Sequence, residues 1–399
     1  MNQPFLLNEV VKIMLRKYRF FFLAFVVFAA PSLLAQKTAK AGTYRVYVGT
    51  YTGPDSKGIY AFPFDPASGK AGALELVAET KNPSFLAVDP TQHYLFAANE
   101  ISDYEGQKSG GISAFAIDAK SGELAFLNEV SSRGAGPCHL ALDRTGKYVL
   151  VANYDSGSIA AFPVQQDGRL GVASSVIQHA GHGPNTERQE RPHAHDITIS
   201  SDNRFVVAND LGLDQLLVYR FDGTKGTLTP NQPAFASVEP GAGPRHSAFH
   251  PNGRFIYALN EIVGSITAFT YDPHSGAMRH LQTISTLPAN FKDKNDSAEI
   301  VVHPSGKFLY ASNRGPDTIA VFAIDSGKGT LKLVESVSTQ GKEPRNFAID
   351  PSGQYLLAAN QNSNNVVVFR IDPKTGRLTA TGQVLEVPSP VCLVFVPMD

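Results

Sequence analysis

The sequence is poor in cysteine and carries almost no net charge. It has two cysteines in 399 residues, too few for a disulfide scaffold, a zinc knuckle or the ligands of an iron–sulfur cluster. Lys and Arg number 35 against 36 Asp and Glu, a formal net charge of −1. A nucleic-acid or anionic-membrane binder would need a basic excess, so this balance argues against both classes. The sequence also lacks a Gly-x-Ser-x-Gly elbow, a phosphate loop and a dinucleotide fingerprint.

What the sequence does contain is enough apolar material for a sizeable core. Hydrophobic residues make up 43% of the chain and charged residues 18%, a composition that is typical of a folded protein rather than a disordered one. The length of 399 residues, taken alone, suggests two or three ordinary domains. Internal repeats can override that expectation.

The N-terminal segment has the pattern of an export signal. A basic stretch precedes an apolar run at 20–30, and small residues follow to Ala35. The run is shorter than the roughly 20 residues of a membrane span, and no cysteine follows it to carry a lipid. We predict that residues 1–41 are a signal peptide and short linker, and that the protein is periplasmic or secreted without a stable membrane anchor. The alternative is an uncleaved anchor, and cleavage after Ala35 or after Ala41 fits equally well.

The rest of the chain repeats one unit. Each copy has a Pro, a β-rich stretch, a Pro/Gly turn and a second β-rich stretch that ends in Asn; the Asn residues are 99, 153, 209, 260, 313 and 360, at intervals of 54, 56, 51, 53 and 47 residues. Short strands repeated at about this period predict a β-propeller with four strands in each blade. Outer strands are expected to begin near Leu124, Leu170, Leu228, Leu331 and Leu378.

The two ends of the repeat region complete the count of blades. Residues 390–397 match the first strand of a unit, and residues 44–50 match a second strand with Thr50 in place of Asn. We therefore predict an all-β fold in which 42–399 form a single seven-bladed propeller of four antiparallel strands per blade, closed by N- and C-terminal strands that share a blade. Such closure hides sheet edges. We expect a monomer.

Ionisable residues are expected to gather at one mouth of the propeller channel. In an antiparallel blade the start of the first strand and the end of the second lie at the same end of the sheet. The repeated Asn keeps its type, which indicates a strand-end hydrogen-bonding role, whereas the neighbouring positions vary in charge. Such a mouth suits an anionic or polyhydroxy ligand, and a solvated rim of unrelated charges is the alternative. The residues concerned are His139, His193, His195, Asp210, Arg245, His246, Glu261, Glu299, Arg314 and Arg345.

Other candidate features are weaker. A metal cluster could be built from His179, His182, His193 and His195. A His-x-His pair on a strand is not diagnostic, however, and only Asp196 adds an acid close by, so we predict neither a metal nor another cofactor. Cys138 and Cys392 fall in units two apart and are expected to be free and buried. The polar insertion 185–191 is expected either to overhang the mouth or to form a solvated loop.

Several motifs resemble one known family. The residues are Glu187–His195 (ERQERPHAH), Gly243–Pro251 (GPRHSAFHP), Ala258–Glu261 (ALNE), Ala311–Arg314 (ASNR) and Val387–Cys392 (VPSPVC). In their residues and in their order along the chain, these motifs resemble the seven-bladed propeller lactonases. That family includes bacterial 6-phosphogluconolactonases of the propeller type and fungal carboxy-muconate cyclases. The resemblance covers residues 44–397.

The resemblance implies a metal-independent lactone site at one channel mouth. Its catalytic residues would be His195 (or His193), Arg245, Glu261 and Arg314. The other mouth residues, His139, His193, Asp210, His246, Glu299 and Arg345, would bind the substrate. The export signal departs from what a cytoplasmic phosphorylated substrate requires, and it favours an unphosphorylated sugar lactone or another exported substrate.

Three functions fit these observations. The first is a lactonase that hydrolyses a small-molecule lactone, with Glu261 or a histidine as general base and with Arg245 and Arg314 holding the substrate's anionic group and the developing oxyanion. The second is an exported binding module without catalysis, since propellers host many roles. The third is a lactone-forming cycloisomerase, which product analysis would distinguish from a hydrolase.

Overall fold

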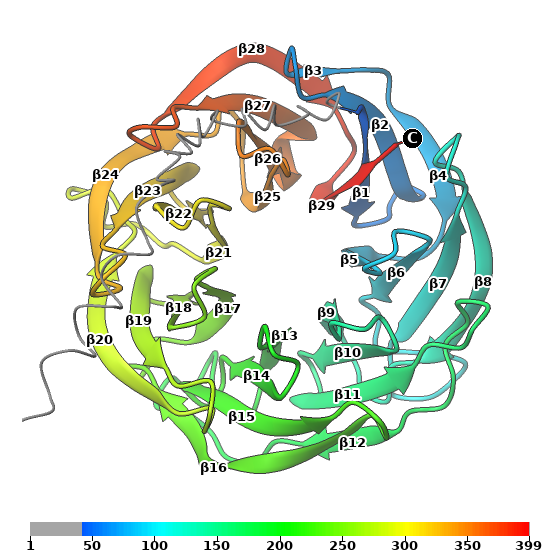
Figure 1. The fold of residues 1–399 in the computed structure, drawn as a ribbon, viewed down its shortest axis with the longest axis vertical. Helices are drawn as coiled ribbons and strands as arrows, with labels where there is room; N and C mark the ends of the chain where they lie inside the picture. Colours follow the sequence, from blue (N-terminus) through cyan, green and yellow to red (C-terminus); the bar gives the residue numbers. More distant parts are fainter. Residues whose placement is uncertain (1–41, 399) are drawn as a thin grey trace, which may run out of the picture. The chain divides into compact units, whose positions relative to one another are not determined.

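The computed structural model describes residues 42–398, and the predicted signal segment lies outside the described residues. Apart from the 3₁₀ helix η1 (Gln361–Ser363), the regular structure of this part of the chain is β-strand. The strands form seven sheets arranged around a common centre (Figure 1). The predicted all-β, seven-bladed propeller is therefore confirmed. No helix within 42–398 is long and apolar enough to cross a membrane.

The two ends of the chain share one blade. Its innermost strand, β29 (Pro390–Pro397), pairs with β1 (Tyr44–Thr50), which pairs in turn with β2 (Gly58–Asp65). The outer edge of this blade consists of two short strands, β3 (Lys70–Ala71) and β4 (Glu75–Glu79). The first and last strands of the described chain thus close the ring through backbone hydrogen bonds, as predicted.

The other six blades each have four antiparallel strands that follow one another from the centre of the ring outward (Figure 1). The first three are β5 (Pro83–Val88), β6 (Tyr94–Asn99), β7 (Gly111–Ile117) and β8 (Leu124–Ser131); β9 (Pro137–Leu142), β10 (Tyr148–Asn153), β11 (Ser158–Pro163) and β12 (Ser175–Gln178); and β13 (Ala194–Ile199), β14 (Phe205–Asp210), β15 (Gln215–Asp222) and β16 (Thr227–Ser237). The last three are β17 (Pro244–Phe249), β18 (Phe255–Asn260), β19 (Ser265–Tyr271) and β20 (Met278–Ser285); β21 (Ser297–Val302), β22 (Phe308–Asn313), β23 (Thr318–Ile324) and β24 (Leu331–Ser338); and β25 (Pro344–Ile349), β26 (Tyr355–Asn360), β27 (Asn365–Ile371) and β28 (Leu378–Glu386).

The hydrophobic core lies between neighbouring blades. Seven clusters of buried side chains within 42–398 each join two adjacent sheets. Successive side chains of a strand point to opposite faces of its sheet, so the middle strands contribute to both of their interfaces. In β10, for example, Leu150 packs against the next blade, whereas Val149 and Val151 pack against the preceding one.

Glycines in the outer turns let adjacent blades approach closely. Gly226, between β15 and β16, has a φ of +66°, and a Cβ placed on it would lie 2.0 Å from Cε1 of Tyr148 in the preceding blade. Only glycine accommodates both that backbone angle and that contact without strain. Gly276 stands in the same relation to Phe205, so this contact repeats around the ring.

One predicted outer strand is wrong in position. In the third blade along the chain the outer strand begins at Ser175, not near Leu170. Leu170 forms only an isolated bridge with Val164, and its side chain is buried in the core. The amide of Gly171 then donates to the carbonyl of Pro163, which turns the backbone away before regular pairing with β11 starts. The expected starts at Leu124, Leu331 and Leu378 are confirmed, and β16 begins one residue before Leu228.

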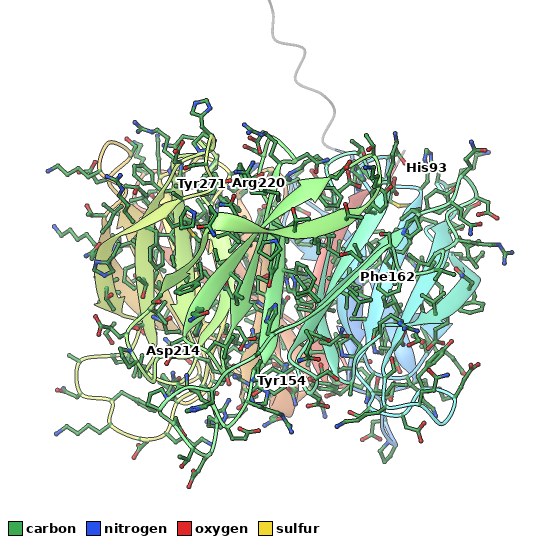
Figure 2. The ribbon with its side chains drawn as sticks, turned by 90° about the horizontal axis from the view of Figure 1, so that it is seen from below. His93, Tyr154, Phe162, Asp214, Arg220 and Tyr271 are labelled. Atoms are coloured by element: carbon green, nitrogen blue, oxygen red, sulfur yellow. The ribbon has the colours of Figure 1, made fainter. Side chains whose placement is uncertain are left out.

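The strand ends form two sets at opposite ends of the ring. Figure 2 shows Tyr154 and Asp214 at one end, and His93, Arg220 and Tyr271 at the other. Tyr154 directly follows β10, so the first of these ends is where the second strand of a blade stops and the inner strand begins. That end therefore carries the residues that follow each second strand.

Bulges at the start of the inner strands decide which side chains face this end. Cys138, His195 and Arg345 are each skipped in the pairing between the first and second strands of their blades. Arg245 and His246 are skipped together. A bulge bends the strand locally and redirects the side chain that it carries. Residues that would otherwise continue a regular ladder are thereby available for the site.

Candidate active site

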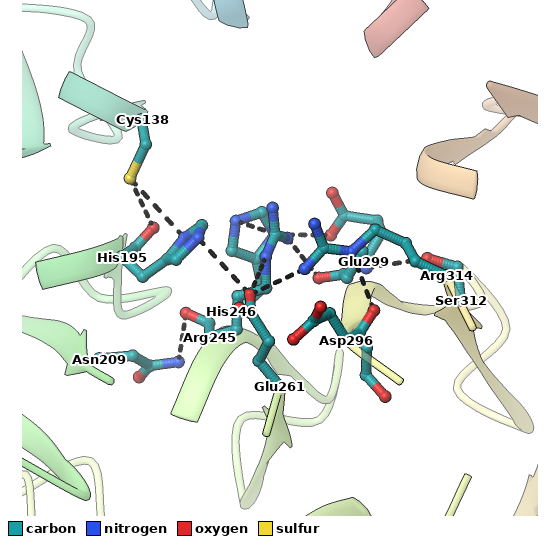
Figure 3. A network of polar contacts seen from close by, with 12 residues as sticks. Cys138, His195, Asn209, Arg245, His246, Glu261, Asp296, Glu299, Ser312 and Arg314 are labelled. Atoms are coloured by element: carbon teal, nitrogen blue, oxygen red, sulfur yellow. Dashed lines mark hydrogen bonds and ion pairs between the residues drawn. The ribbon is translucent and has the colours of Figure 1, made fainter. Parts of the chain in front are cut away.

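Glu261 lies at the centre of a cluster of basic side chains (Figure 3). It directly follows β18, and its Oε2 atom lies 3.0 Å from Nε of Arg245 and 3.0 Å from Nη2 of Arg314. Its Oε1 atom accepts a hydrogen bond from Nη2 of Arg188. Burial favours the neutral acid, but Arg314, Arg245 and Arg188 outweigh it and lower the pKa of Glu261 to about 2. Glu261 is therefore an anion at neutral pH.

His195 faces this carboxylate from the bulge of β13. Its Nε2 atom lies 3.9 Å from Oε2 of Glu261, beyond the distance of a direct hydrogen bond. On its other side, Sγ of Cys138 lies 3.7 Å from Nδ1 and 3.5 Å from the carbonyl oxygen of His195. Burial, reinforced by the charge of Arg245, lowers the pKa of His195 well below its ordinary value. The imidazole is thus neutral at neutral pH.

A second buried polar cluster adjoins His195. The ring of His246 lies 5.2 Å from that of His195 and 4.9 Å from that of His139. Nδ1 of His246 is 3.1 Å from Oε1 of Glu299, whose other oxygen accepts a 2.6 Å hydrogen bond from the Asn346 amide. Burial lowers the pKa of His246 and raises that of Glu299. These groups are in contact with one another, so they form a continuous polar layer beside the Glu261 cluster.

Asp196 completes that layer from β13. Its Oδ1 atom lies 3.3 Å from Nε2 of His139, and its Oδ2 accepts hydrogen bonds from the amide and hydroxyl of Ser247 at 2.9 and 2.8 Å. Burial outweighs these hydrogen bonds and raises the pKa of Asp196 to about 7. At neutral pH this carboxyl therefore exists in both protonation states.

Two further predicted residues lie at the edge of the cluster. The guanidinium of Arg345 lies 5.2 Å from the ring centre of Tyr51, whose hydroxyl donates to Glu100. The ring of His193 stacks on Tyr154 with centroids 4.4 Å apart. Arg345 and His193 therefore each pack against the ring of a tyrosine.

Asp210 does not belong to the cluster, and its predicted place at the mouth is wrong. It ends β14 and pairs with Ala194, the first residue of the inner strand, as an Asn does in five of the other blades. Its Oδ1 accepts from the amides of His193 and Gly212 at 2.7 and 3.0 Å, and its Oδ2 lies 2.7 Å from Nδ1 of His179. The fully buried carboxylate thus performs the strand-end role that was assigned to Asn209.

One inserted residue in this unit explains the error. Outside the shared blade, each second strand runs six residues from an aromatic residue to its polar end, as in β10 and β18, and β14 does so from Phe205 to Asp210. Counting from the aromatic residue rather than from Asn would have placed Asp210 correctly. Counted back from that aromatic residue, the position held by His139 and His246 in their blades is held by Asp196 in this one, and not by His195. Asp196 is accordingly a site residue that the sequence columns missed.

The predicted strand-end role of the Asn column is confirmed in the other blades. The Asn153 amide donates to the carbonyl of Ser132 and to the hydroxyl of Ser158, and the Asn313 amide donates to the carbonyl of Thr286. The bonds to Ser132 and Thr286 tie the end of a second strand to the loop that precedes its own blade, and the bond to Ser158 ties it to the third strand.

Comparison with known proteins identifies the family. The profile described as "Lactonase, 7-bladed beta-propeller" matches residues 45–395. The chain belongs to the seven-bladed β-propeller lactonase family. The propeller lactonase resemblance of the sequence motifs is thus confirmed.

Named relatives of this propeller lactonase cover between 76% and 90% of its length. It is 41% identical over 353 residues to the 6-phosphogluconolactonase of Bacillus subtilis, which covers 88% of this chain and 98% of that protein. It is 38% identical over 310 residues to the 6-phosphogluconolactonase of Formosa agariphila, covering 76% of this chain and 86% of that one. The periplasmic gluconolactonase of Pseudomonas aeruginosa has a similar structure, with a TM-score of 0.83, 36% identity, and coverage of 90% of this chain and 100% of that one.

The Glu261 cluster contains residues that the repeat columns did not indicate. Arg188 comes from the insertion 185–191, which thereby reaches the site. Its Nη1 atom lies 3.0 Å from Oδ1 of Asp296, a residue of the loop before β21. Nη1 of Arg314 lies 3.6 Å from Glu343. These contacts join loops far apart in sequence, and no repeat column marks them.

The four candidate metal-ligating histidines of the lactonase separate in space. His179 contacts Asp210, His182 is exposed, His193 lies 3.3 Å from Glu190, and His195 faces the cluster. Within the described part of the chain, no three His, Cys, Asp or Glu side chains are grouped so that they could hold a metal ion. Cys138 and Cys392 are buried and unbridged, as predicted.

Proposed function

We propose that this protein hydrolyses a small sugar-type lactone at the Glu261 cluster. The observation that carries the proposal is a neutral imidazole, that of His195, which faces a buried carboxylate held between Arg245 and Arg314. A proton acceptor beside fixed positive charge is what attack of water on an ester carbonyl requires. Relatives named 6-phosphogluconolactonase and gluconolactonase support the lactone as the substrate class.

Of the two candidate bases, His195 is the better one. Glu261 has a pKa of about 2, and both of its oxygens are already held by guanidiniums. Burial lowers the pKa of His195 as well, but its ring faces a carboxylate that stabilises the imidazolium formed when it takes a proton. The thiol of Cys138 lies within reach of the carbonyl of His195, and its sulfur within reach of Nδ1. The Cys138 thiol donates its proton to the carbonyl of His195, and the N–H at Nδ1 of His195 points toward the sulfur. The proton of the imidazole is then on Nδ1, so Nε2 has a free lone pair, which faces Glu261 and the substrate. Burial raises the pKa of Cys138, which keeps this group a thiol.

The reaction then proceeds in two proton transfers. Water gives a proton to Nε2 of His195 while its oxygen attacks the lactone carbonyl carbon. The resulting oxyanion is stabilised by the guanidiniums of Arg245 and Arg314, and the imidazolium by the carboxylate of Glu261. When the ring C–O bond breaks, the leaving alkoxide takes the proton from Nε2, so the base is restored. General base catalysis of this kind contributes about 10²–10⁴ in rate.

We also propose that the enzyme is exported and that its substrate is unphosphorylated. The basic, apolar and small-residue pattern of residues 1–41 supports export, and one relative is named a periplasmic gluconolactonase. Cell fractionation followed by N-terminal sequencing tests this proposal. We expect mature protein in the periplasmic or secreted fraction, with an N-terminus that follows Ala35 or Ala41. Intact chain in the membrane fraction would contradict it.

The proposal predicts that the purified full chain opens δ-gluconolactone faster than buffer alone, at about pH 6.5. Proton release is followed in weakly buffered solution, with the 6-phosphate of the lactone in parallel. Because the guanidiniums supply the positive charge that a metal would otherwise supply, activity should persist after treatment with EDTA. Binding without acceleration on either lactone would favour the binding module, and lactone accumulation from the acid would favour the cycloisomerase.

A further inference from the structure

The loop at 185–191 presents Arg188 to the site on a fixed turn. The side-chain oxygen of Asn185 accepts from the amides of Glu187 and Arg188 at 3.1 and 3.2 Å. The next residue, Gln189, is fully buried, and its amide group donates to the carbonyl of Leu211 and to the carboxylate of Asp214. The turn is thus bonded both internally and to the adjacent blade, and the position of Arg188 is determined by it.

Arg188 occupies the side of Glu261 that the other two arginines leave open. Arg245 and Arg314 both approach Oε2, whereas Arg188 donates to Oε1. The second arm of Arg188 lies 3.0 Å from Asp296, so the guanidinium is held at both ends. Its side chain is 31% exposed, against 3% for Arg245 and 9% for Arg314. A change at Arg188 therefore perturbs Glu261 with less disturbance of the core than a change at either partner.

We propose that Arg188 is a positioning residue for the reaction: it holds Glu261 ionised and turned so that Oε2 faces His195. The inference rests on the proposed function, in which the carboxylate stabilises the imidazolium of His195. It assigns a role to the insertion 185–191 that the lactone chemistry alone does not require. Asp296 acts with it by fixing the guanidinium.

The charged groups around Glu261 determine whether loss of the Arg188 charge raises or lowers the pKa of that carboxyl. The titratable and charged groups that face Glu261 or Arg188 are Tyr154, His195, Arg245, His246, Asp296, Arg314 and Arg345. Removal of the Arg188 charge leaves two guanidiniums against Glu261, which raises the pKa of that carboxyl. Activity that needs the carboxylate is present above its pKa and is lost as the pH falls through it. In the proposed mechanism His195 must also be unprotonated, so the acid limb belongs to the Glu261–His195 pair, and loss of a neighbouring positive charge moves it to higher pH.

The test compares pH–rate profiles of the full chain with δ-gluconolactone. In Arg188→Met we expect the acid limb of kcat/KM to rise by about one pH unit or more and kcat to fall about tenfold. Arg188→Lys retains a charge at the same position and should recover most of both. The control is Arg191→Met, the same change in the same loop at an exposed residue whose ion pair is with Glu190; its profile should match the wild type.

Two results would overturn the inference: an equal loss of activity at every pH with an unmoved acid limb, or no loss at all. The first would mean that Arg188 only anchors the loop. Thermal unfolding of each variant shows that it is folded.

A second measurement separates this inference from the proposed function. The carboxyl resonances of ¹³C-labelled glutamates are titrated in the wild type and in Arg188→Met, with Glu261 assigned from Glu261→Gln. A rise in the Glu261 pKa in a protein that opens no lactone would sink the proposed function and support the electrostatic role of Arg188. An active protein whose Glu261 titrates identically with and without Arg188 would contradict that role.

Discussion

A single carboxylate, that of Glu261, organises the side chains of the candidate site. It has three arginine partners, and their combined charge reverses the effect that burial alone would have on its pKa. Its partner His195 shows the opposite case, because burial and a neighbouring cation both favour the neutral ring. The two groups therefore differ in role although they lie close together. An anion held by three arginines stands beside a neutral imidazole.

The importance of His195 is testable by one substitution. His195→Gln removes the proton acceptor while keeping a polar side chain, and kcat/KM for δ-gluconolactone should fall by at least about 10²-fold. His182→Gln makes the same change at an exposed histidine whose ring bonds only to the neighbouring carbonyl of Gly183. That control should retain wild-type activity. A fully active His195→Gln would transfer the role of base to another group.

Among the structural elements, the inner strands position the site and the outer turns position the strands. A regular strand would alternate its side chains between the two faces of the blade. The bulges at Cys138, His195 and Arg345 interrupt that alternation at one end of the ring. The outer glycine turns have a different task, because they allow an aromatic ring of the preceding blade to pack directly on the backbone. The elements thus serve chemistry at the centre and packing at the periphery.

The turn packing predicts a stability effect far from the site. Gly226→Ala adds a Cβ at a positive φ and against the ring of Tyr148, so it should lower the free energy of unfolding by about 1–3 kcal/mol. The control is Gly327→Ala in the β23–β24 turn, where the nearest atom lies 3.4 Å from the added Cβ. That change should stay within about 0.5 kcal/mol of the wild type. Denaturant titration compares the two, and equal stabilities would contradict the packing argument.

The ring as a whole depends on its closing strand. β29 supplies the innermost strand of the first blade, and it carries Leu393 and Cys392 into the two core clusters on either side. Without it, β1 would present an unpaired edge toward the centre of the ring, and such edges invite aggregation. The seven interfaces are therefore completed only when the last strand of the chain has paired with the first.

Truncation tests this closure. A chain that stops after Ser389 lacks β29 and should elute as aggregate and lose its cooperative thermal transition. A chain that stops after Pro397 keeps the strand and should behave as the intact protein. Size-exclusion chromatography and calorimetry report the difference. A monomeric, cooperatively folded product of the shorter chain would show that closure by β29 is dispensable.

The sequence by itself determined the blades, because each blade is built from local patterns that repeat. Strand alternation, turn glycines and the Asn column recur at a regular spacing, and the two unmatched ends complete one another. Comparison of equivalent positions in the repeats also predicted Arg245, Glu261 and Arg314 as site residues. It predicted His195 only when positions were counted from the Asn, not from the aromatic residue of the second strand. The unit that contains β13 and β14 has one extra residue, so counting from Asn assigned Asp210 to the mouth position. Leu211 is the residue that occupies this position in the structure. Asp196 was missed for the same reason.

Only the tertiary structure decided the charge state of the site and its full membership. Three guanidiniums meet at Glu261 from residues 188, 245 and 314, and Asp296 fixes one of them from another loop. Sequence patterns record which residue types are present, whereas a pKa depends on the distances between charges and on their burial. Those distances arise when seven blades close into one ring. That is why a carboxylate that the sequence offered as a base is instead an anion at neutral pH.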